Sequence, residues 1–394
     1  MQKKVTMNSG RYVFSQIVSF MSVYEFNKCV ERYQGNKGVR DLSCWDQFLQ
    51  LFFGQLTGRR GLRDICTCLK AHQPNLYHLG IRQAVNFSTL SRAYESRDSR
   101  IFSDFGQHLI KRVSSLYAKD KQREFDVENP IFALDSTTIS VSIKLWKWAR
   151  GKYSRGAVKV HTLMDLHGNI PTFIHITDGK THDVNTLDLL DITANAIYVM
   201  DRAYIDFSRL FLLDQAGSFF VVRAKDNLIF DIAETMSVDA ENTDVLDDKK
   251  ILLRGIKSKI SYPKFLRRIT HYDREKKLAL IFLTNNFYEN AETIAQIYRN
   301  RWQIEVFFKW IKQNLQIKTL WGHSENAVKT HIWVAICTYL IVAQIKKQLK
   351  SNLSIYEMMQ IFSVSCFSKT PLTQLLTESH SKQNVNELNL FNFS

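Results

Sequence analysis

The stretch Ile131–Ile143, with the sequence IFALDSTTISVSI, decides the fold that we predict for this chain. Its first four residues form a continuous apolar run that ends at Asp135, and apolar and polar residues alternate in the residues that follow. A short apolar run that passes into alternation predicts a buried β-strand. Two further strands are predicted at 157–166 and 170–176, joined by a turn at 167–169. The three strands together predict a meander.

Helices and strands alternate in the segment after the meander. A helix at 184–190 precedes a short apolar strand at 197–200, and a helix at 206–215 precedes a further strand at 219–223. Three meandering strands followed by alternating helices and strands predict an α/β fold built on a mixed sheet.

Residues 226–290 interrupt this alternation. The segment 231–248 carries seven Asp/Glu and no Lys/Arg, and strand-like segments follow at 251–256, 265–272 and 278–284. We therefore predict an insertion at about 226–290 that is built mainly from β-strands.

The first third of the chain is basic and has a helical pattern. Residues 1–125 hold 20 Lys/Arg against 10 Asp/Glu, so they carry a net charge of +10. Apolar residues recur at helical spacing within 14–21 and within 48–53. A small helical domain with arginines near helix starts suits DNA binding. The alternative is a helical domain whose solvent-facing side happens to be basic.

Composition and net charge narrow the classes of protein. The 394 residues are 45% hydrophobic and 23% charged, which predicts a folded protein rather than a disordered one. The net charge of +15 predicts a polyanionic partner, either nucleic acid or an anionic membrane surface. Membrane insertion is not expected, because the most apolar run, Ile332–Ala343, is shorter than the ~20 residues that a bilayer requires. This apolar run predicts a buried core helix. Because residues 1–25 show no signal-peptide pattern, we expect a cytoplasmic protein.

The segment Tyr298–Leu315, YRNRWQIEVFFKWIKQNL, predicts one amphipathic helix. At about 100° per residue, five polar side chains fall within an arc of roughly 80°. They are Tyr298, Arg301, Glu305, Lys309 and Lys312. Apolar residues flank this arc on both sides, which directs the glutamate into a cleft rather than into open solvent. The alternative is that Glu305 forms an ordinary ion pair one turn away, worth only about 0.2–0.5 kcal/mol.

Two further carboxylates stand at the ends of short apolar strands, Asp135 after 131–134 and Asp201 after 197–200. A buried carboxylate is costly unless it is hydrogen-bonded or binds a cation. Together with Glu305, these acids could hold two hard divalent cations about 4 Å apart, which activate a water and stabilise the leaving oxygen in an in-line attack on phosphorus. Combined with the basic net charge, the three acids indicate phosphodiester chemistry.

These residues resemble those of a known family, the DDE transposases of bacterial insertion sequences, which have an RNase H-like catalytic core. Within that family the chain is similar to the group with the helix signature Y-x2-R-x3-E-x6-K. The residues that match this signature without a gap are Tyr298, Arg301, Glu305 and Lys312. Lys309 matches a further basic position that some members have.

The resemblance extends well beyond this helix. Asp135 in FALDST and Asp201 in VMDRAY match the first two acids of the family's triad. The match spans about 130–345, and residues 10–125 resemble the helical N-terminal domain of such transposases. It implies a helical N-terminal DNA-binding domain at 1–125, an RNase H-like catalytic domain at 126–345 with the β-rich insertion, and a C-terminal helical tail at 346–394.

The resemblance also implies a function. The protein would bind the terminal inverted repeats of an insertion sequence and catalyse its excision and integration by a cut-and-paste route. Asp135, Asp201 and Glu305 would be the catalytic residues and metal ligands, with two Mg²⁺ ions expected and Mn²⁺ able to substitute. The helix residues that grip phosphates would be Tyr298, Arg301, Lys309 and Lys312. The partners would be double-stranded DNA, as transposon ends and as target, and a second copy of the chain in the synaptic complex, in a bacterial, nucleoid-associated setting without a membrane.

A basic loop is predicted between the first two strands. Four cations cluster there with aromatic residues between them, a composition that suits contacts to DNA backbone and bases. They are Arg150, Lys152, Arg155 and Lys159. A plain exposed hairpin is the alternative. Arg202, directly after Asp201, could likewise contact a phosphate or pair with a core carboxylate.

Some relatives stack a flipped base near the cleavage site on a tryptophan. An aromatic ring is the side chain that such stacking requires. This chain has no tryptophan between residues 149 and 301, so Phe287 and Tyr288 are the candidate substitutes.

Two other functions are compatible with the same residues. A DNA-binding regulator could keep the fold without catalysis, although the intact triad argues against it. A metal-dependent DNA endonuclease without strand transfer would use the same three acids. DNA joined to a target distinguishes a transposase from a nuclease, and cleaved DNA distinguishes either from a regulator.

Overall fold

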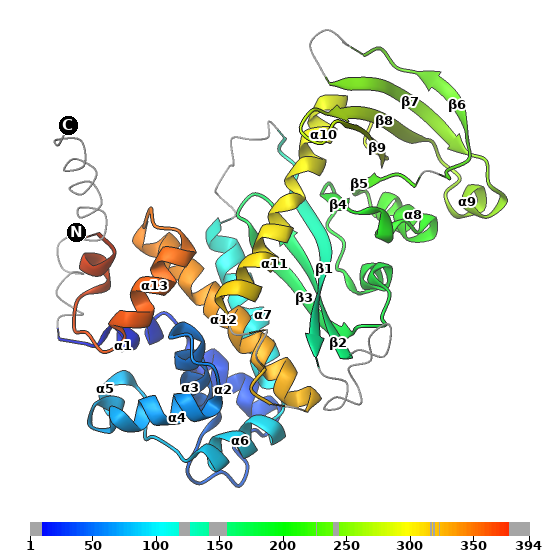
Figure 1. Cartoon of the computed structure of the whole chain (residues 1–394). Helices are drawn as coiled ribbons and strands as arrows, with labels where there is room; N and C mark the ends of the chain where they lie inside the picture. Colours follow the sequence, from blue (N-terminus) through cyan, green and yellow to red (C-terminus); the bar gives the residue numbers. More distant parts are fainter. Residues whose placement is uncertain are drawn as a thin grey trace, which may run out of the picture. The chain divides into compact units, whose positions relative to one another are not determined.

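The computed structural model describes residues 10–117, 127–141, 156–225, 227–238, 244–315, 317, 320–322 and 324–377. The chain divides into two compact units, both drawn in Figure 1. The strand unit comprises Tyr117–Ile143 and Ala149–Phe308. The helical unit comprises Met1–Leu116, Lys144–Trp148 and Lys309–Ser394.

The strand unit is built on one mixed sheet. Its first five strands are β1 (Ile131–Val141), β2 (Gly156–Asp165), β3 (Ile170–Asp178), β4 (Ile197–Met200) and β5 (Phe219–Arg223). They lie in the order β3-β2-β1-β4-β5. β2 is antiparallel to β1 and β3, whereas β4 is parallel to β1 and β5. A meander beside two parallel strands in this order is the arrangement of an RNase H-like sheet, so the predicted fold class is confirmed.

The insertion extends the same sheet. Its strands are β6 (Phe230–Thr235), β7 (Val245–Leu253), β8 (Leu266–Asp273) and β9 (Leu278–Thr284). The sheet continues from β5 in the order β9-β8-β7-β6. The prediction of a β-rich insertion is confirmed, but β7 begins inside the acidic segment and ends at Leu253, whereas the sequence predicts a strand at 251–256. An acidic segment can form this strand because Asp248 is buried against Arg267 of β8, with N–O distances of 3.0 and 2.7 Å.

Short helices connect the strands of this unit. They are η5 (Asp183–Leu189), η6 (Arg202–Tyr204), α8 (Phe207–Gln215), α9 (Ile256–Ser261) and α10 (Ala291–Asn300). η5 is a 3-10 helix at the position where the sequence predicts a helix at 184–190. α8 and α10 cover opposite faces of β4 and β5 (Figure 1). Leu210 and Leu213 of α8 are buried on one face, and Ile294 and Ile297 of α10 are buried on the other.

The helical unit gathers helices from both ends of the chain. Those before residue 118 are α1 (Val13–Val18), α2 (Val23–Arg32), α3 (Cys44–Leu56), α4 (Leu62–Ala71), η3 (Gln73–Asn75), α5 (Leu76–Leu79), α6 (Phe87–Ser96) and α7 (Arg100–Tyr117). Those near the C-terminus are α12 (Glu325–Leu349) and α13 (Ile355–Ser365). Between them, α11 (Trp302–Asn314) begins in the strand unit and ends in the helical unit.

α12 is the core helix of the helical unit. It packs against α3, α6 and α13. Among the described residues it is the one helix long and apolar enough to cross a membrane, yet 94% of its most apolar stretch is buried within the fold. The core helix predicted for 332–343 is therefore confirmed. α12 thus packs with helices of the first third of the chain, whereas the division predicted from the sequence places most of it in the same domain as the strands. The DNA-binding role of residues 1–125 stays a prediction.

Candidate active site

The register of the parallel strands aligns three charged residues. Leu134 of β1 pairs with Met200 of β4, and Met200 pairs with Val222 of β5. The next residue on each strand is charged. These residues are Asp135, Asp201 and Arg223. Because side chains alternate along a strand and neighbouring strands lie about 4.8 Å apart, the three side chains lie side by side on one face of the sheet.

The third acid comes from the helices above the sheet. The sequence predicts one helix over Tyr298–Leu315, but the structure interrupts it: α10 ends at Asn300 and α11 begins at Trp302. Arg301 stands between the two helices. Its N–H donates to the Tyr298 carbonyl, and its own carbonyl accepts from the Ile304 N–H, both at 3.1 Å. These are the i→i+3 bonds of a tight 3-10 turn, so the prediction of one continuous helix is wrong at this residue.

Arg301 connects two of the acids. Its Nη1 donates to Asp135 Oδ2 at 2.9 Å, and its Nη2 donates to Glu305 Oε1 at 2.6 Å. The side chains of Arg301 and Asp135 are 15% and 18% exposed, whereas that of Glu305 is 50% exposed. Tyr298 supports the arginine: the guanidinium carbon lies 5.7 Å from the centre of its ring, which packs on Phe282 with 4.6 Å between ring centres. The guanidinium therefore occupies a fixed, largely buried position between a strand and a helix.

Burial and neighbouring charge perturb the acids and the tyrosine. Burial raises the pKa of Asp135 to about 6, with the Asp201 and Glu305 carboxylates adding to the rise and the Arg301 guanidinium opposing it. Burial also raises the pKa of Tyr298. The Asp201 carboxylate adds to this rise, and the Arg301 and Arg223 guanidinium groups oppose it. These six charged or titratable side chains therefore form one electrostatic cluster.

Arg223 is the member of this cluster that sequence reasoning missed. It lies at the end of β5, where a cation is ordinary, and it carries no motif. In the part of the chain that the structure describes, no hydrogen bond or ion pair involves its guanidinium. The signal that could have found it is its position at the carboxyl end of a short apolar strand, since Asp201 follows β4 and Arg223 is the last residue of the neighbouring β5.

Asp201 takes a different local role from Asp135. It is half-buried, and its Oδ1 accepts the Ala203 N–H at 2.8 Å, which caps η6. Arg202 in η6 is exposed and forms no ion pair with any described residue, so the alternative of pairing with a core carboxylate has no support within the described chain.

The donor set has the chemistry of a divalent-cation site. Asp135, Asp201 and Glu305 offer carboxylate oxygens, the ligands that hard cations such as Mg²⁺ prefer. Among the described residues, however, no three acidic, histidine or cysteine side chains converge closely enough to hold an ion as they stand. The Arg301 guanidinium lies between two of the three carboxylates, so binding a cation by all three requires these side chains to rearrange.

The remaining predicted cations are placed as follows. Lys309 and Lys312 follow on α11, with Lys309 exposed and Lys312 partly buried. Lys159 of β2 donates to Asp183 Oδ1 at 3.1 Å and to the Thr181 carbonyl at 2.8 Å, so its ammonium is held within the fold. The predicted loop residues that lie outside the described residues are Arg150, Lys152 and Arg155.

Asp183 fixes the strand next to the acids. Its Oδ1 accepts the Ser136 hydroxyl at 2.7 Å as well as the Lys159 ammonium, and the buried His161 ring lies 3.7 Å from it. Ser136 follows Asp135 and points to the opposite face of β1. The polar group around Asp183 therefore holds β1 and β2 in place behind the acid cluster.

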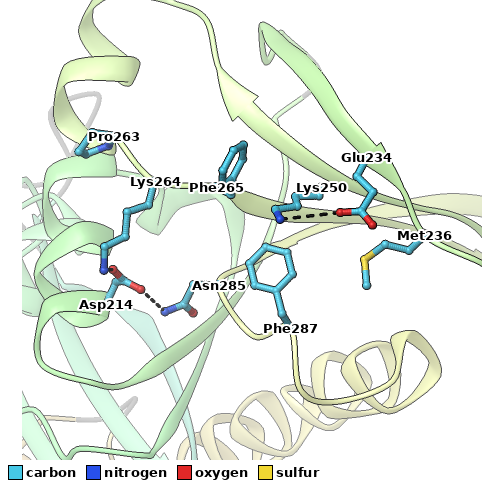
Figure 2. A pocket seen from close by; sticks show the side chains of 9 residues that line it. All are labelled: Asp214, Glu234, Met236, Lys250, Pro263, Lys264, Phe265, Asn285 and Phe287. Atoms are coloured by element: carbon cyan, nitrogen blue, oxygen red, sulfur yellow. Dashed lines mark hydrogen bonds and ion pairs between the residues drawn. The ribbon is translucent and has the colours of Figure 1, made fainter.

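A pocket of about 680 Å³ lies beside the insertion strands, and Figure 2 shows the side chains that line it. Phe287 and Phe265 are among them, and the Lys250 ammonium nitrogen lies 4.7 Å from the centre of the Phe265 ring. The Phe287 loop is held rigidly, because Arg267 donates to the carbonyls of Asn286 and Glu289. Of the two aromatic candidates for base stacking, Phe287 thus lines a pocket, and the neighbouring Tyr288 is 86% exposed.

Two family models match the sequence. The model described as a transposase DDE domain matches residues 127–341, which include the three acids and Arg301. A second model, described as a domain of unknown function, matches residues 9–82 in the helical unit.

Curated proteins resemble the chain over similar lengths. The "Probable transposase for insertion sequence element IS5377" of Geobacillus stearothermophilus is 29% identical over 282 residues, 70% of this chain and 73% of that protein. The "Putative transposase for insertion sequence element IS4SA" of Synechocystis sp. is 30% identical over 270 residues, 66% of this chain and 72% of that protein. Among solved structures, the piggyBac transposase synaptic complex with hairpin DNA matches with a TM-score of 0.48 at 10% identity, over 97% of this chain and 86% of that chain.

Proposed function

Because the chain belongs to the transposase DDE domain family and is a transposase acting on DNA, we propose that Asp135, Asp201 and Glu305 are its catalytic acids. The observation that carries this proposal is the placement of the acids in the strand unit. Asp135 and Asp201 follow paired residues of adjacent parallel strands. Arg301 links the first of these acids to Glu305 through two charge-assisted hydrogen bonds.

The family acts with a divalent metal ion, and we propose that two Mg²⁺ ions bind at the three acids, with Mn²⁺ able to substitute. The oxygen donors fit hard cations. Asp135 also has a raised pKa beside two other carboxylates, so further positive charge is stabilising at this place. When bound, the metal activates the attacking water and stabilises the leaving oxygen during phosphoryl transfer.

The chain's own cations position the DNA in this proposal. Arg301 orients Asp135 and Glu305, and its planar fork can turn to a phosphate, which accepts the same paired hydrogen bonds as a carboxylate. Tyr298 holds Arg301 against the sheet through its ring. Arg223 points to the same face as Asp135 and Asp201, where it offers positive charge to the phosphate that is cleaved.

Other cations extend the DNA contact beyond the acids. We assign phosphate contacts to Lys309, Lys312 and Arg202. The same role is proposed for Arg150, Lys152 and Arg155 of the predicted loop and for Lys159 of β2. A DNA contact from Lys159 requires its ion pair with Asp183 to open. Phe287, on its rigid loop, is the aromatic side chain that we assign to base stacking, at about 1–3 kcal/mol per stacked base.

The biological reaction that we propose is excision of an insertion sequence and its integration into a target by a cut-and-paste route. Residues 1–125, with their net charge of +10, would bind the terminal inverted repeats. Two ends must be brought together, so the protein would act as a homodimer on double-stranded DNA. Its place would be the bacterial cytoplasm, at the nucleoid.

The test is cleavage of an end-labelled duplex that carries one terminal repeat, in the presence of Mg²⁺ and a target plasmid. Asp135→Asn, Asp201→Asn and Glu305→Gln keep the side-chain shape and remove the charge. Each should abolish cleavage while leaving duplex binding in place. Glu275→Gln, an exposed glutamate in the turn after β8, is the matched control and should cleave like the wild type.

The products separate the alternatives. DNA joined to the plasmid identifies strand transfer, whereas nicked DNA without joining identifies an endonuclease. Binding with neither product identifies a regulator. Cleavage that persists in the Glu305→Gln protein overturns the assignment of the third acid.

A further inference from the structure

A second pocket lies at the carboxyl ends of β4 and β5, on the side of the sheet that α8 covers. Its volume is about 410 Å³. Described residues of three segments line it: 205–208 at the start of α8, Lys225 and 227–229 after β5, and residues between 255 and 261 at the turn into α9. All three belong to the strand unit. Nothing in the acid cluster described above uses this pocket.

Among the described residues that line the pocket, two ammonium groups stand against one carboxylate. Lys225 and Lys257 line it and are exposed. Within the described chain, neither ammonium forms a hydrogen bond or an ion pair. Asp206 also lines the pocket, but its carboxylate is already satisfied, because it caps the Arg209 N–H at 3.1 Å and binds Arg209 Nη1 at 2.9 Å. The pocket therefore attracts an anion.

The rest of the lining fits a sugar–phosphate unit rather than a bare ion. Ser208, Ser258 and Asn227 supply hydroxyl and amide donors, and Phe207 and Leu228 supply an apolar wall. Hydroxyl and amide groups of this kind are common partners of phosphate oxygens in DNA complexes.

Gly255 keeps one of these donors at the pocket. A Cβ at this position would lie only 2.8 Å from the Ser258 hydroxyl oxygen. A larger residue would therefore displace that hydroxyl, whereas glycine leaves it where it lines the pocket with Lys257.

The pocket and the acid cluster share one edge of the sheet. β4 ends where Asp201 follows it, and β5 ends at Arg223, two residues before Lys225. Two residues of extended chain span only about 7 Å. A DNA strand held at the acids therefore meets Lys225 after a short path over the same edge.

We propose that this pocket binds a backbone phosphate of the DNA strand that flanks the cleavage position, with Lys225 and Lys257 as its cationic ligands. The inference rests on the proposed function, because it requires DNA at the neighbouring acids. It adds a DNA contact on the face of the sheet that α8 covers, opposite the face on which Asp135 and Arg301 lie. The contact is to the backbone, so it adds affinity without base specificity.

The test measures how DNA affinity depends on salt. The full chain binds a fluorescent terminal-repeat duplex in EDTA, which prevents cleavage, at several salt concentrations. Each phosphate contact contributes about 0.9 to the slope of log K against log salt. Lys225→Ala and Lys257→Ala should each reduce the slope by about that amount, and the double variant by about twice as much. Lys259→Ala, an exposed lysine of α9 outside the pocket, is the matched control and should keep the wild-type slope.

Each result separates this inference from the proposed function. A wild-type protein that binds no terminal-repeat duplex overturns the proposed function, and this inference falls with it. An unchanged slope in the double variant, with normal wild-type binding, overturns the pocket alone. An equal reduction of the slope in Lys259→Ala also overturns the pocket assignment, since the effect would then come from the net charge of the protein rather than from this pocket.

A calorimetric titration with inorganic phosphate distinguishes the two sources of a phosphate group. Saturable phosphate binding that the double variant loses, together with an unchanged DNA slope, assigns the pocket to free phosphate and overturns the DNA contact. A reduced DNA slope without saturable phosphate binding supports the contact to DNA. Thermal unfolding of each variant checks that the fold is intact.

Discussion

The guanidinium of Arg301 lies 2.9 Å from the carboxylate of Asp135, a residue 166 positions earlier in the chain. Its second arm reaches Glu305 at 2.6 Å, so one side chain joins the first acid on β1 to the last acid on α11. The tight turn between α10 and α11 places it there. The position of Glu305 over the sheet therefore depends on a residue that is not itself an acid.

Replacement of Arg301 by lysine should reduce cleavage by on the order of 10²-fold. A lysine keeps the charge but has one compact ammonium, so it cannot donate to both carboxylates in the planar geometry of a guanidinium. Cleavage of the terminal-repeat duplex under saturating DNA measures the effect. Arg299→Lys, an exposed arginine two residues earlier, should cleave normally. Full activity in Arg301→Lys would mean that charge alone matters at this position.

Replacement of Arg223 by alanine should slow the cleavage step more than it weakens DNA binding. Its side chain lies in line with Asp135 and Asp201 and has no ion pair in the described chain, so a cleaved phosphate is its natural partner. Single-turnover rates and dissociation constants for the same duplex separate the two effects. Arg254→Ala removes an exposed arginine that pairs with Asp231 and serves as the control. Equal losses of rate in both variants would contradict a specific role for Arg223.

The contribution of His161 to the stability of the strand unit should fall as the pH drops from about 6.5 to about 4. Burial lowers the pKa of His161 to about 4, while Asp183 opposes this and Lys159 and His175 add to it. Between these pH values the imidazole binds a proton in the unfolded chain but not in the folded chain, so the His161 contribution rises with pH, by ~3 kcal/mol over the window.

Urea unfolding at pH 7 and pH 5 measures this dependence. His161→Gln should lose this contribution relative to the wild type, because the histidine is gone, whereas Asp135, whose raised pKa acts in the opposite sense, is present in both proteins. His78→Gln, at an exposed position of the helical unit, should leave it unchanged. An equally steep dependence in His161→Gln would show that another group is responsible.

Asp248→Asn should destabilise the strand unit by about 3–5 kcal/mol. It leaves the Arg267 guanidinium, which is 4% exposed, without its carboxylate partner. Chemical denaturation provides the measurement. Asp247→Asn, on the same strand but 29% exposed, should cost less than about 1 kcal/mol. The double variant Asp248→Leu/Arg267→Met should recover part of the lost free energy of unfolding, since removing both charges leaves neither one unpaired. If the double variant shows no recovery, the destabilisation comes from altered packing rather than from an unpaired charge.

Local patterns in the sequence locate the strands of the core and single out three candidate acids. The short apolar run before Asp201 marks β4, and the run before Asp135 marks the first part of β1, which continues past this residue to Val141. The helical spacing of Tyr298, Arg301 and Glu305 marks the third acid in the same local way. Each of these signals lies within a few residues of chain, which is why pattern alone finds it.

Which of these residues meet depends on contacts between segments that are far apart in the chain. Arg223 joins the acids through the register of β4 and β5, and register is a pairing between distant strands that no local pattern encodes. The break at Arg301 was hidden for the same reason, since its side chain bonds to Asp135 on β1. The buried pair of Asp248 and Arg267 likewise turned an acidic segment into a strand. In each case a contact between segments far apart in the chain outweighed the local preference.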